Sequence, residues 1–194
     1  MEEFWFYVQL GLRHVLDINA YDHILFLAAL AIPFTIRSWK KVVLLATAFT
    51  IAHCLSLALS VYGIATVDAG LIEFFIPVTI LLTALFNLFY VNQTTGPKKI
   101  WVHLLATLFF GIVHGFGFSN YFKMLMAEEE QKLGPLLGFA TGIEISQVTV
   151  IACVLALGLV VQSVFKVPQR WFTLVGSIII LVITIPMLIK TFPL

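Results

Sequence analysis

Histidine and acidic side chains interrupt the apolar segments of this sequence at several separate places. Asp22 and His23 are adjacent to each other just before one apolar run, and His53 lies midway along the next. His114 and Glu144 lie inside two further runs. Imidazole and carboxylate groups suit zinc, nickel, cobalt, iron and manganese, and the 2 cysteines are isolated, so no thiolate motif accompanies them. These residues therefore indicate a site for a divalent transition-metal ion.

Three further residues complete the candidate set. Glu73 stands near the start of the third apolar run, where it either helps to draw a cation in or is merely interfacial and hydrated. Gln147 follows Glu144 by three residues, so both lie on one face of a helix. His14 lies near the outer surface and either forms an access site or is solvated. The candidate metal ligands are therefore Asp22, His23, His53, His114, Glu144, Glu73, Gln147 and His14.

Several of these residues also have a purely structural interpretation. Asp22 is a favourable residue at the start of a helix, and His53 taken alone fits a buried histidine bonded to a backbone carbonyl equally well. Depth in the membrane separates the alternatives, because an ionisable side chain there is costly unless it is paired, hydrated or metal-bound. One such residue is explained by packing. Three imidazoles and three carboxylates at matched depth favour a functional site.

The elements that must position these residues are membrane-spanning helices. A spanning helix needs about 20 apolar residues. The first apolar run, 24–36, is too short alone, so its helix is expected to begin near Ile18 and to carry Asp22 and His23 inside it. Residues 3–16 predict an interfacial helix or the entrance to a span. The other runs are 42–62, 71–91, 100–118, a run that follows 134–135 and reaches about 165, and 171–189.

The composition agrees with a membrane protein. Of the 194 residues, 61% are hydrophobic and 11% are charged, and the mean hydropathy is +1.05. A soluble domain contains about 25% charged residues, so a soluble globular enzyme and a disordered chain are excluded. The net charge of +1 leaves no basic face for nucleic acid. We therefore expect an all-α, polytopic membrane helix bundle of six spans plus the N-terminal helix, a single transmembrane domain over 1–194 with no signal peptide.

Basic residues predict the orientation of the chain. Cytoplasmic loops carry an excess of lysine and arginine, so both termini are expected outside the cytoplasm, in a bacterial inner membrane. The expected partners are a metal ion and the lipid bilayer, and short loops with close-packing glycines permit a homo-oligomer. The excess lies in the loops after the first, third and fifth runs, which hold seven of the 11 basic residues, namely Arg37, Lys40, Lys41, Lys98, Lys99, Lys166 and Arg170.

Four motifs at these residues, 11–14 with 21–27, 49–57, 113–118 and 142–144, resemble those of the HupE/UreJ family, the hydrogenase and urease accessory membrane proteins. They match its second branch best, and the resemblance covers nearly the whole chain. It implies a membrane protein of six or seven helices with a role in nickel or cobalt permeation. The well-known branch has a second histidine one turn before the position of His114 and a glutamate three residues after it, where this chain has Phe110 and Gly117.

These observations lead first to a metal permease of the nickel or cobalt type. No ATP-binding motif is present, so the membrane potential or an ion gradient must drive it, and uptake should fall at acidic pH as histidine protonates. The alternative is a membrane-embedded metal-dependent hydrolase with Glu144 or Asp22 as general base. A metal-sensing or assembly partner of a larger complex is a third possibility. The candidate residues do not distinguish nickel, cobalt and zinc as the bound metal ion.

Overall fold

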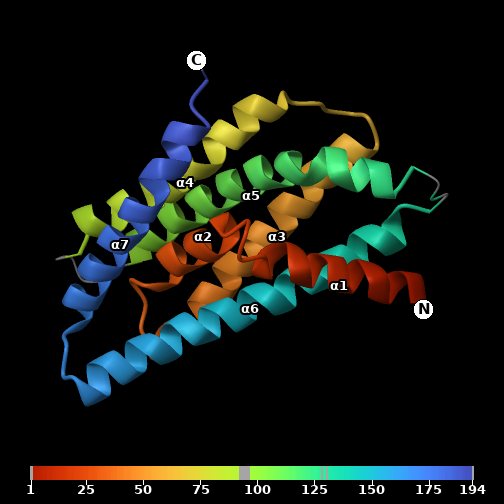
Figure 1. Cartoon of the computed structure of the whole chain (residues 1–194). Helices are drawn as coiled ribbons and strands as arrows, with labels where there is room; N and C mark the ends of the chain where they lie inside the picture. Colours follow the sequence, from red (N-terminus) through yellow and green to blue (C-terminus); the bar gives the residue numbers. More distant parts are fainter. Residues whose placement is uncertain (1, 92–96, 128, 130, 194) are drawn as a thin grey trace.

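The structure is a computed structural model that describes residues 2–91, 97–127, 129 and 131–193, with the backbone only at 97–99, and it is helical with no strand over that part of the chain. Figure 1 shows the helices gathered into one bundle, with α4 and α7 packed against each other at one side. The elements are α1 (Glu2–Leu16), α2 (Asp22–Ala31), a 3-10 turn η1 (Ile36–Ser38), α3 (Trp39–Val61), α4 (Ala69–Phe89), α5 (Pro97–Leu125), α6 (Leu133–Val164) and α7 (Gln169–Lys190).

Five helices are long and apolar enough to cross a membrane, which makes the chain an integral membrane protein. They confirm the prediction of long apolar helices over the second to sixth runs. Helix α6 has 32 residues, more than the ~20 that a bilayer needs. The five apolar stretches are Ile36–Val61, Ala69–Phe89, Ile100–Leu125, Leu133–Val164 and Gln169–Lys190.

The first expected helix differs from the prediction. It begins at Asp22 and not near Ile18, and its ten residues reach only ~15 Å. The cause is a turn centred on Asp17, whose side-chain Oδ1 accepts the backbone N–H of Asn19 at 2.8 Å and whose carbonyl accepts that of Ala20 at 3.2 Å. This turn ends α1 and starts α2 as a separate helix. Asp22 is therefore the first residue of α2 and not an interior one.

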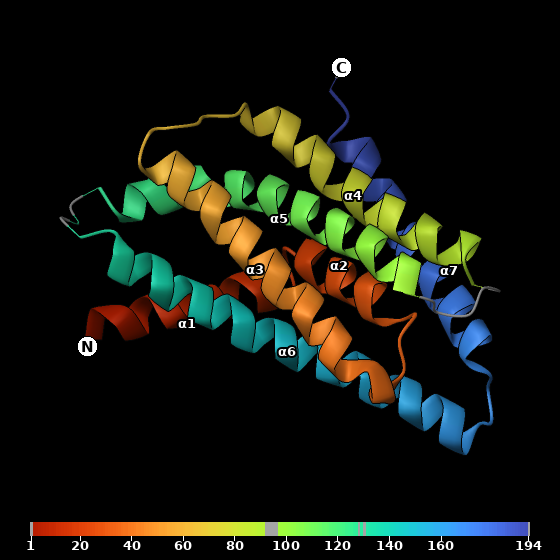
Figure 2. The same ribbon diagram turned by 180° about the vertical axis from the view of Figure 1, so that it is seen from behind.

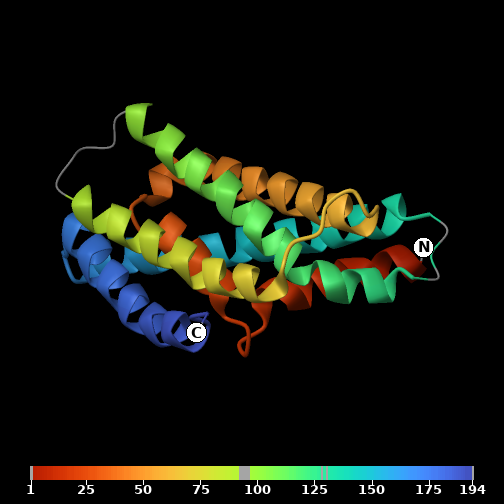
Figure 3. The ribbon, with the colours of Figure 1, turned by 90° about the horizontal axis from the view of Figure 1, so that it is seen from above.

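Helices α1 and α2 follow each other along α6 (Figures 1 and 2). Both contact α6, and Tyr7, Val8 and Val15 of α1 are buried. Figure 3 shows the turn between α1 and α2 projecting from the side of the bundle, roughly midway along it. The N-terminal helix is thus packed lengthwise into the bundle, and its C-terminal end lies inside the bundle's length.

The carbonyl groups at the end of α2 require hydrogen-bond donors from outside the helix. The last carbonyls of a helix have no partner within it, and away from water they cannot stay unpaired. Side chains from two other helices supply the missing donors. Asn87 of α4 donates to the carbonyl of Ala29 at 2.7 Å, and Gln169 of α7 donates to that of Ile32 at 2.7 Å. Thr173 adds a bond to Ile32 at 3.3 Å. Amide side chains therefore allow α2 to end within the bundle.

Direct backbone contact holds α1 against α6. A Cβ atom on Gly11 would overlap the carbonyl oxygen of Phe139, and one on Gly142 would overlap that of Val8. Any side chain at either position would push the two helices apart. In contrast, nothing lies within 4 Å of a Cβ on Gly134. Close helix packing at α6 thus involves Gly142 and not Gly134.

A second contact of this kind joins α5 to α3. A Cβ atom on Gly115 would overlap the carbonyl of His53 and the hydroxyl of Ser56. Helices α3 and α5 share the most extensive contact in the bundle. Since Gly115 follows His114 in the chain, this approach brings His114 close to His53.

We predict that Gly142→Ala destabilises the protein by about 2 kcal/mol or more, because the added methyl group must displace backbone and not a flexible side chain. Gly134→Ala, on the same helix, should have little effect. Thermal unfolding of both variants in detergent, followed by circular dichroism, measures the difference. Equal melting temperatures for the two variants would show that α1 does not pack on α6 in this way.

Candidate metal centre

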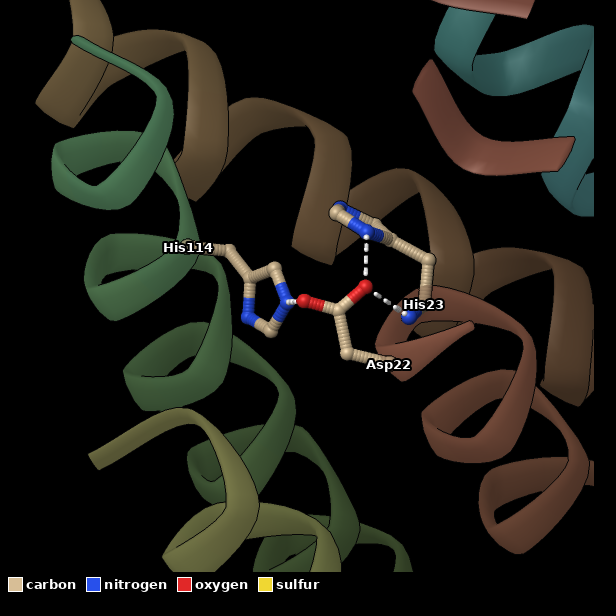
Figure 4. Close-up of side chains that lie close together, drawn as sticks. All are labelled: Asp22, His23 and His114. Atoms are coloured by element: carbon tan, nitrogen blue, oxygen red, sulfur yellow. Dashed lines mark hydrogen bonds and ion pairs between the residues drawn. The ribbon is translucent and has the colours of Figure 1, made fainter. Parts of the chain in front are cut away.

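Asp22 lies between two imidazoles (Figure 4). Its Oδ1 is 3.1 Å from Nδ1 of His23, the next residue of α2, and its Oδ2 is 3.2 Å from Nε2 of His114 on α5. One potential ligand atom from each of the three residues lies within 4.8 Å of the others. Neighbouring ligand atoms of a tetrahedral ion with bonds of ~2.0–2.1 Å are about 3.3 Å apart. The three residues thus lie close enough together to hold a metal ion after a small adjustment of their side chains.

Two further imidazoles border this group. The ring of His14 on α1 lies 4.5 Å from that of His23 and 5.7 Å from that of His53 on α3, measured between centroids. The rings of His23 and His114 are 4.3 Å apart, and those of His23 and His53 are 6.1 Å apart. Four histidines and one carboxylate from α1, α2, α3 and α5 therefore form one cluster, which we call the imidazole cluster: His14, Asp22, His23, His53 and His114.

Three histidines of the imidazole cluster are shielded from solvent, whereas His14 and Asp22 are partly exposed. The exposed fractions of His23, His53 and His114 are 2%, 0% and 3%. Ring nitrogens of the cluster are buried without a hydrogen-bond partner, and buried polar atoms are nearly always bonded to protein, water or an ion. These nitrogens are Nε2 of His14, Nε2 of His23, both nitrogens of His53 and Nδ1 of His114. The cluster therefore fits a bound cation, because neutral imidazoles supply lone pairs that the protein leaves unused.

Asp22 can serve such a cation in two ways. It can be a ligand itself, or it can accept N–H bonds from His23 and His114 and orient their other nitrogens toward the ion, as carboxylates near metal-bound histidines commonly do. In both cases one negative charge lies between two rings. Among the described residues, it is the one carboxylate in hydrogen-bonding contact with the cluster.

Phenylalanine rings surround the imidazole cluster. Phe118 lies 4.0 Å from His14, Phe110 lies 4.0 Å from His114, and Phe49 lies 5.5 Å from His53, all between centroids. An apolar wall of this kind disfavours charged imidazolium. It therefore favours the neutral form that can bind a metal ion.

Glu144 lies outside the imidazole cluster. Its Oε1 and Oε2 accept hydrogen bonds from Thr47 at 2.5 Å and from Thr50 at 2.6 Å, both on α3. Gln147, one turn further along α6, is fully buried, and neither of its amide atoms has a partner. Sequence reasoning missed the two threonines. Their spacing of three residues, continued at His53, is the signal that they share a face of α3.

Glu73 shares a cavity with Asp22 on the outside of the bundle. The cavity has a volume of about 390 Å³ and is also lined by Asn19, Pro77 and Lys190. Glu73 thus lines the same cavity as the carboxylate of the imidazole cluster, which it does not itself join. His103 lies elsewhere on α5, in edge-to-face contact with Phe34 and Phe86.

A protein-family model described as HupE / UreJ protein matches residues 1–191 of the chain, nearly its whole length. No curated protein and no solved structure matches it. The match covers every helix and all five residues of the imidazole cluster. The resemblance expected from the four sequence motifs is therefore confirmed.

We predict that Asp22→Asn weakens binding of a divalent metal ion about 10- to 100-fold, because carboxylates that ligate or orient histidine contribute this much to metal affinity. Isothermal titration of nickel, cobalt and zinc into detergent-purified protein measures the change. Asp68→Asn is the matched control. Asp68 accepts the N–H of Leu71 at the start of α4, where asparagine caps equally well. Unchanged affinity in Asp22→Asn would remove Asp22 from the site.

Proposed function

This chain belongs to the HupE/UreJ family, and we propose that it is a membrane permease for a divalent transition-metal ion, nickel or cobalt first of all. The observation that carries the proposal is the imidazole cluster. Ionisable residues inside a membrane protein commonly mark ion pathways, and imidazole with carboxylate selects nickel, cobalt or zinc over calcium or magnesium. The family, which is associated with nickel and cobalt handling, supports the same cargo.

In this proposal α1 and α2 form one discontinuous crossing. Their 15 and 10 residues correspond to ~37 Å, enough for a hydrocarbon core of ~30 Å. With α3 to α7 this makes six crossings and a single transmembrane domain. Discontinuous helices commonly hold the binding site of transporters at the break. His14 and Asp22 lie on either side of the break, which supports this arrangement. Both termini then face outward, into the periplasm of a bacterium.

The ligands in this proposal are His23, His53 and His114, with Asp22 as ligand or orienting group and His14 at the approach from α1. Glu73 in the outer cavity attracts the cation toward Asp22. Gln147 and Glu144 are not ligands in this scheme. Protonation of the imidazoles competes with the metal, so uptake falls as the pH falls.

A metal-dependent hydrolase remains the second candidate, and one observation favours it. Asn87 and Gln169, two polar side chains near the cytoplasmic ends of their helices, are bonded to carbonyls of Ala29 and Ile32. They are thus not free to line a path from the imidazole cluster to the cytoplasm. In this alternative, the cluster would activate water at a site open to one side only.

The two functions differ in what happens to the metal, and we predict the outcome for a permease. Purified protein in liposomes should accumulate nickel or cobalt inside, and a variant that combines His53→Ala with His114→Ala should reduce the initial rate at least about tenfold, as expected for the loss of two ligands. His103→Gln, which removes a histidine outside the cluster, is the control. Mass spectrometry of the liposome contents measures the metal.

The same samples distinguish a hydrolase from a permease. One metal ion per chain that survives purification, disappears in the His53/His114 variant and never crosses the liposome would contradict the permease and support a fixed catalytic centre. Uptake without tightly retained metal supports the permease, because a transported ion must be able to leave.

The cavity that is lined by Glu73, Asp22 and Lys190 leads to a separate prediction. Glu73→Gln should slow uptake about tenfold at low ionic strength, and Lys190→Gln, which removes a positive charge from the same cavity, should accelerate it. Both effects should fade as salt is added, because salt screens exposed charges. Glu2→Gln, an exposed acid at the start of α1, is the control. If Glu73→Gln and Glu2→Gln behave alike, the ion approaches by another route.

A further inference from the structure

Glu144 occupies a polar site of its own beside α3. Thr47 and Thr50, which hydrogen-bond its two oxygens, lie near the middle of that 23-residue helix. Among the described residues no lysine, arginine or histidine pairs with the carboxyl group. The titratable group that faces it from α3 is the thiol of Cys54. A carboxylate at membrane depth without a cation beside it is costly.

The two threonines can serve either form of Glu144. Each hydroxyl carries one proton and lies near a second acceptor, the carbonyl of Val43 at 3.1 Å for Thr47 and that of Ala46 at 3.3 Å for Thr50. When Glu144 is ionised, both hydroxyls donate to it. When Glu144 is protonated, its O–H donates to one threonine oxygen, and that threonine turns its own proton to the helix carbonyl. The other threonine continues to donate. No polar atom loses its partner in either state.

We propose that Glu144 is a proton-binding site, and that loading of the imidazole cluster with a divalent cation releases its proton. The coupling rests on the proposed function, whereas the proton site does not. Thr50 and His53 are three residues apart on α3, a rise of ~4.5 Å. A divalent cation at His53 therefore stabilises the ionised carboxylate nearby. By reciprocity, protonation of Glu144 weakens cation binding. In the proposed permease, this antagonism would couple inward movement of the cation to outward movement of a proton.

The step involves one O–H bond and no redox change. Cation binding favours dissociation of the Glu144 O–H, the proton passes to water, and the hydroxyls of Thr47 and Thr50 both turn to the carboxylate. Departure of the cation reverses each change. A glutamine at this position would keep the same shape and hydrogen bonds, but it would carry no exchangeable proton.

Infrared difference spectroscopy tests the proton site without reference to metal transport. The purified wild-type protein should show the carbonyl band of a protonated carboxyl group that disappears as the pH is raised, and Glu144→Gln should lack this band. Thr50→Val should move the disappearance to higher pH, because the carboxylate then loses a donor and the carboxyl form is favoured. A band that is unchanged in Glu144→Gln, or that is absent at every pH, would overturn the proposal.

Proton release on nickel addition tests the coupling. In weakly buffered detergent solution, the wild-type protein should release more protons per bound nickel ion than Glu144→Gln, by up to about one. Glu144→Gln should still bind nickel, because Glu144 lies outside the imidazole cluster. Equal proton release by the two proteins would overturn the coupling and leave the permease standing. A titrating band in a wild-type protein that neither binds nickel or cobalt nor accumulates them in liposomes would overturn the permease and the coupling, and would leave the proton site standing.

Discussion

Contact between the backbones of α1 and α6 is the interaction on which the site depends. The absent side chains of Gly11 and Gly142 let α1 lie so close to α6 that His14 enters the bundle. The chain then turns at Asp17 and resumes as α2, which places Asp22 and His23 beside His14. A similar approach at Gly115 brings α5 to α3. Helix–helix association in membranes relies on such packing, since lipid gives no hydrophobic drive between helices.

A break in a helix within a bilayer creates unpaired backbone groups, and the protein satisfies them with polar side chains. Asn87, Gln169 and Thr173 donate hydrogen bonds to carbonyls at the end of α2, those of Ala29 and Ile32. These residues therefore stabilise the backbone at one end of α2, while Asp22 and His23 belong to the imidazole cluster at the other end. Uncharged amide and hydroxyl side chains stabilise the irregular backbone, so that few charged residues are needed outside the polar centre. The chain accordingly contains only 11% charged residues.

Much of the structure was predictable from the sequence, because the bilayer imposes length and polarity on each helix. Helices α3 to α7 follow from apolar runs. The depth expected for Asp22, His23, His53 and His114 indicated that these side chains lie near one another. The break before α2 was not predicted, because apolarity does not show where a turn at Asp17 interrupts a helix. Glu144 was expected near the imidazoles. In the structure Glu144 contacts Thr47 and Thr50 instead, because the rotation of α6 relative to α3 decides which side chains it meets. The sequence pattern of a single helix does not show this rotation.

The phenylalanines around the imidazole cluster have a consequence for hydration. Phe49, Phe110 and Phe118 present carbon where a hydrated ion would need water, so a cation must shed most of its water shell to reach His53 or His114. Magnesium gives up that shell reluctantly and gains little from nitrogen ligands, whereas nickel and cobalt recover the loss through imidazole. In the proposed permease, the aromatic wall is thus expected to favour cations that lose water readily, so that magnesium is disfavoured before it contacts any ligand.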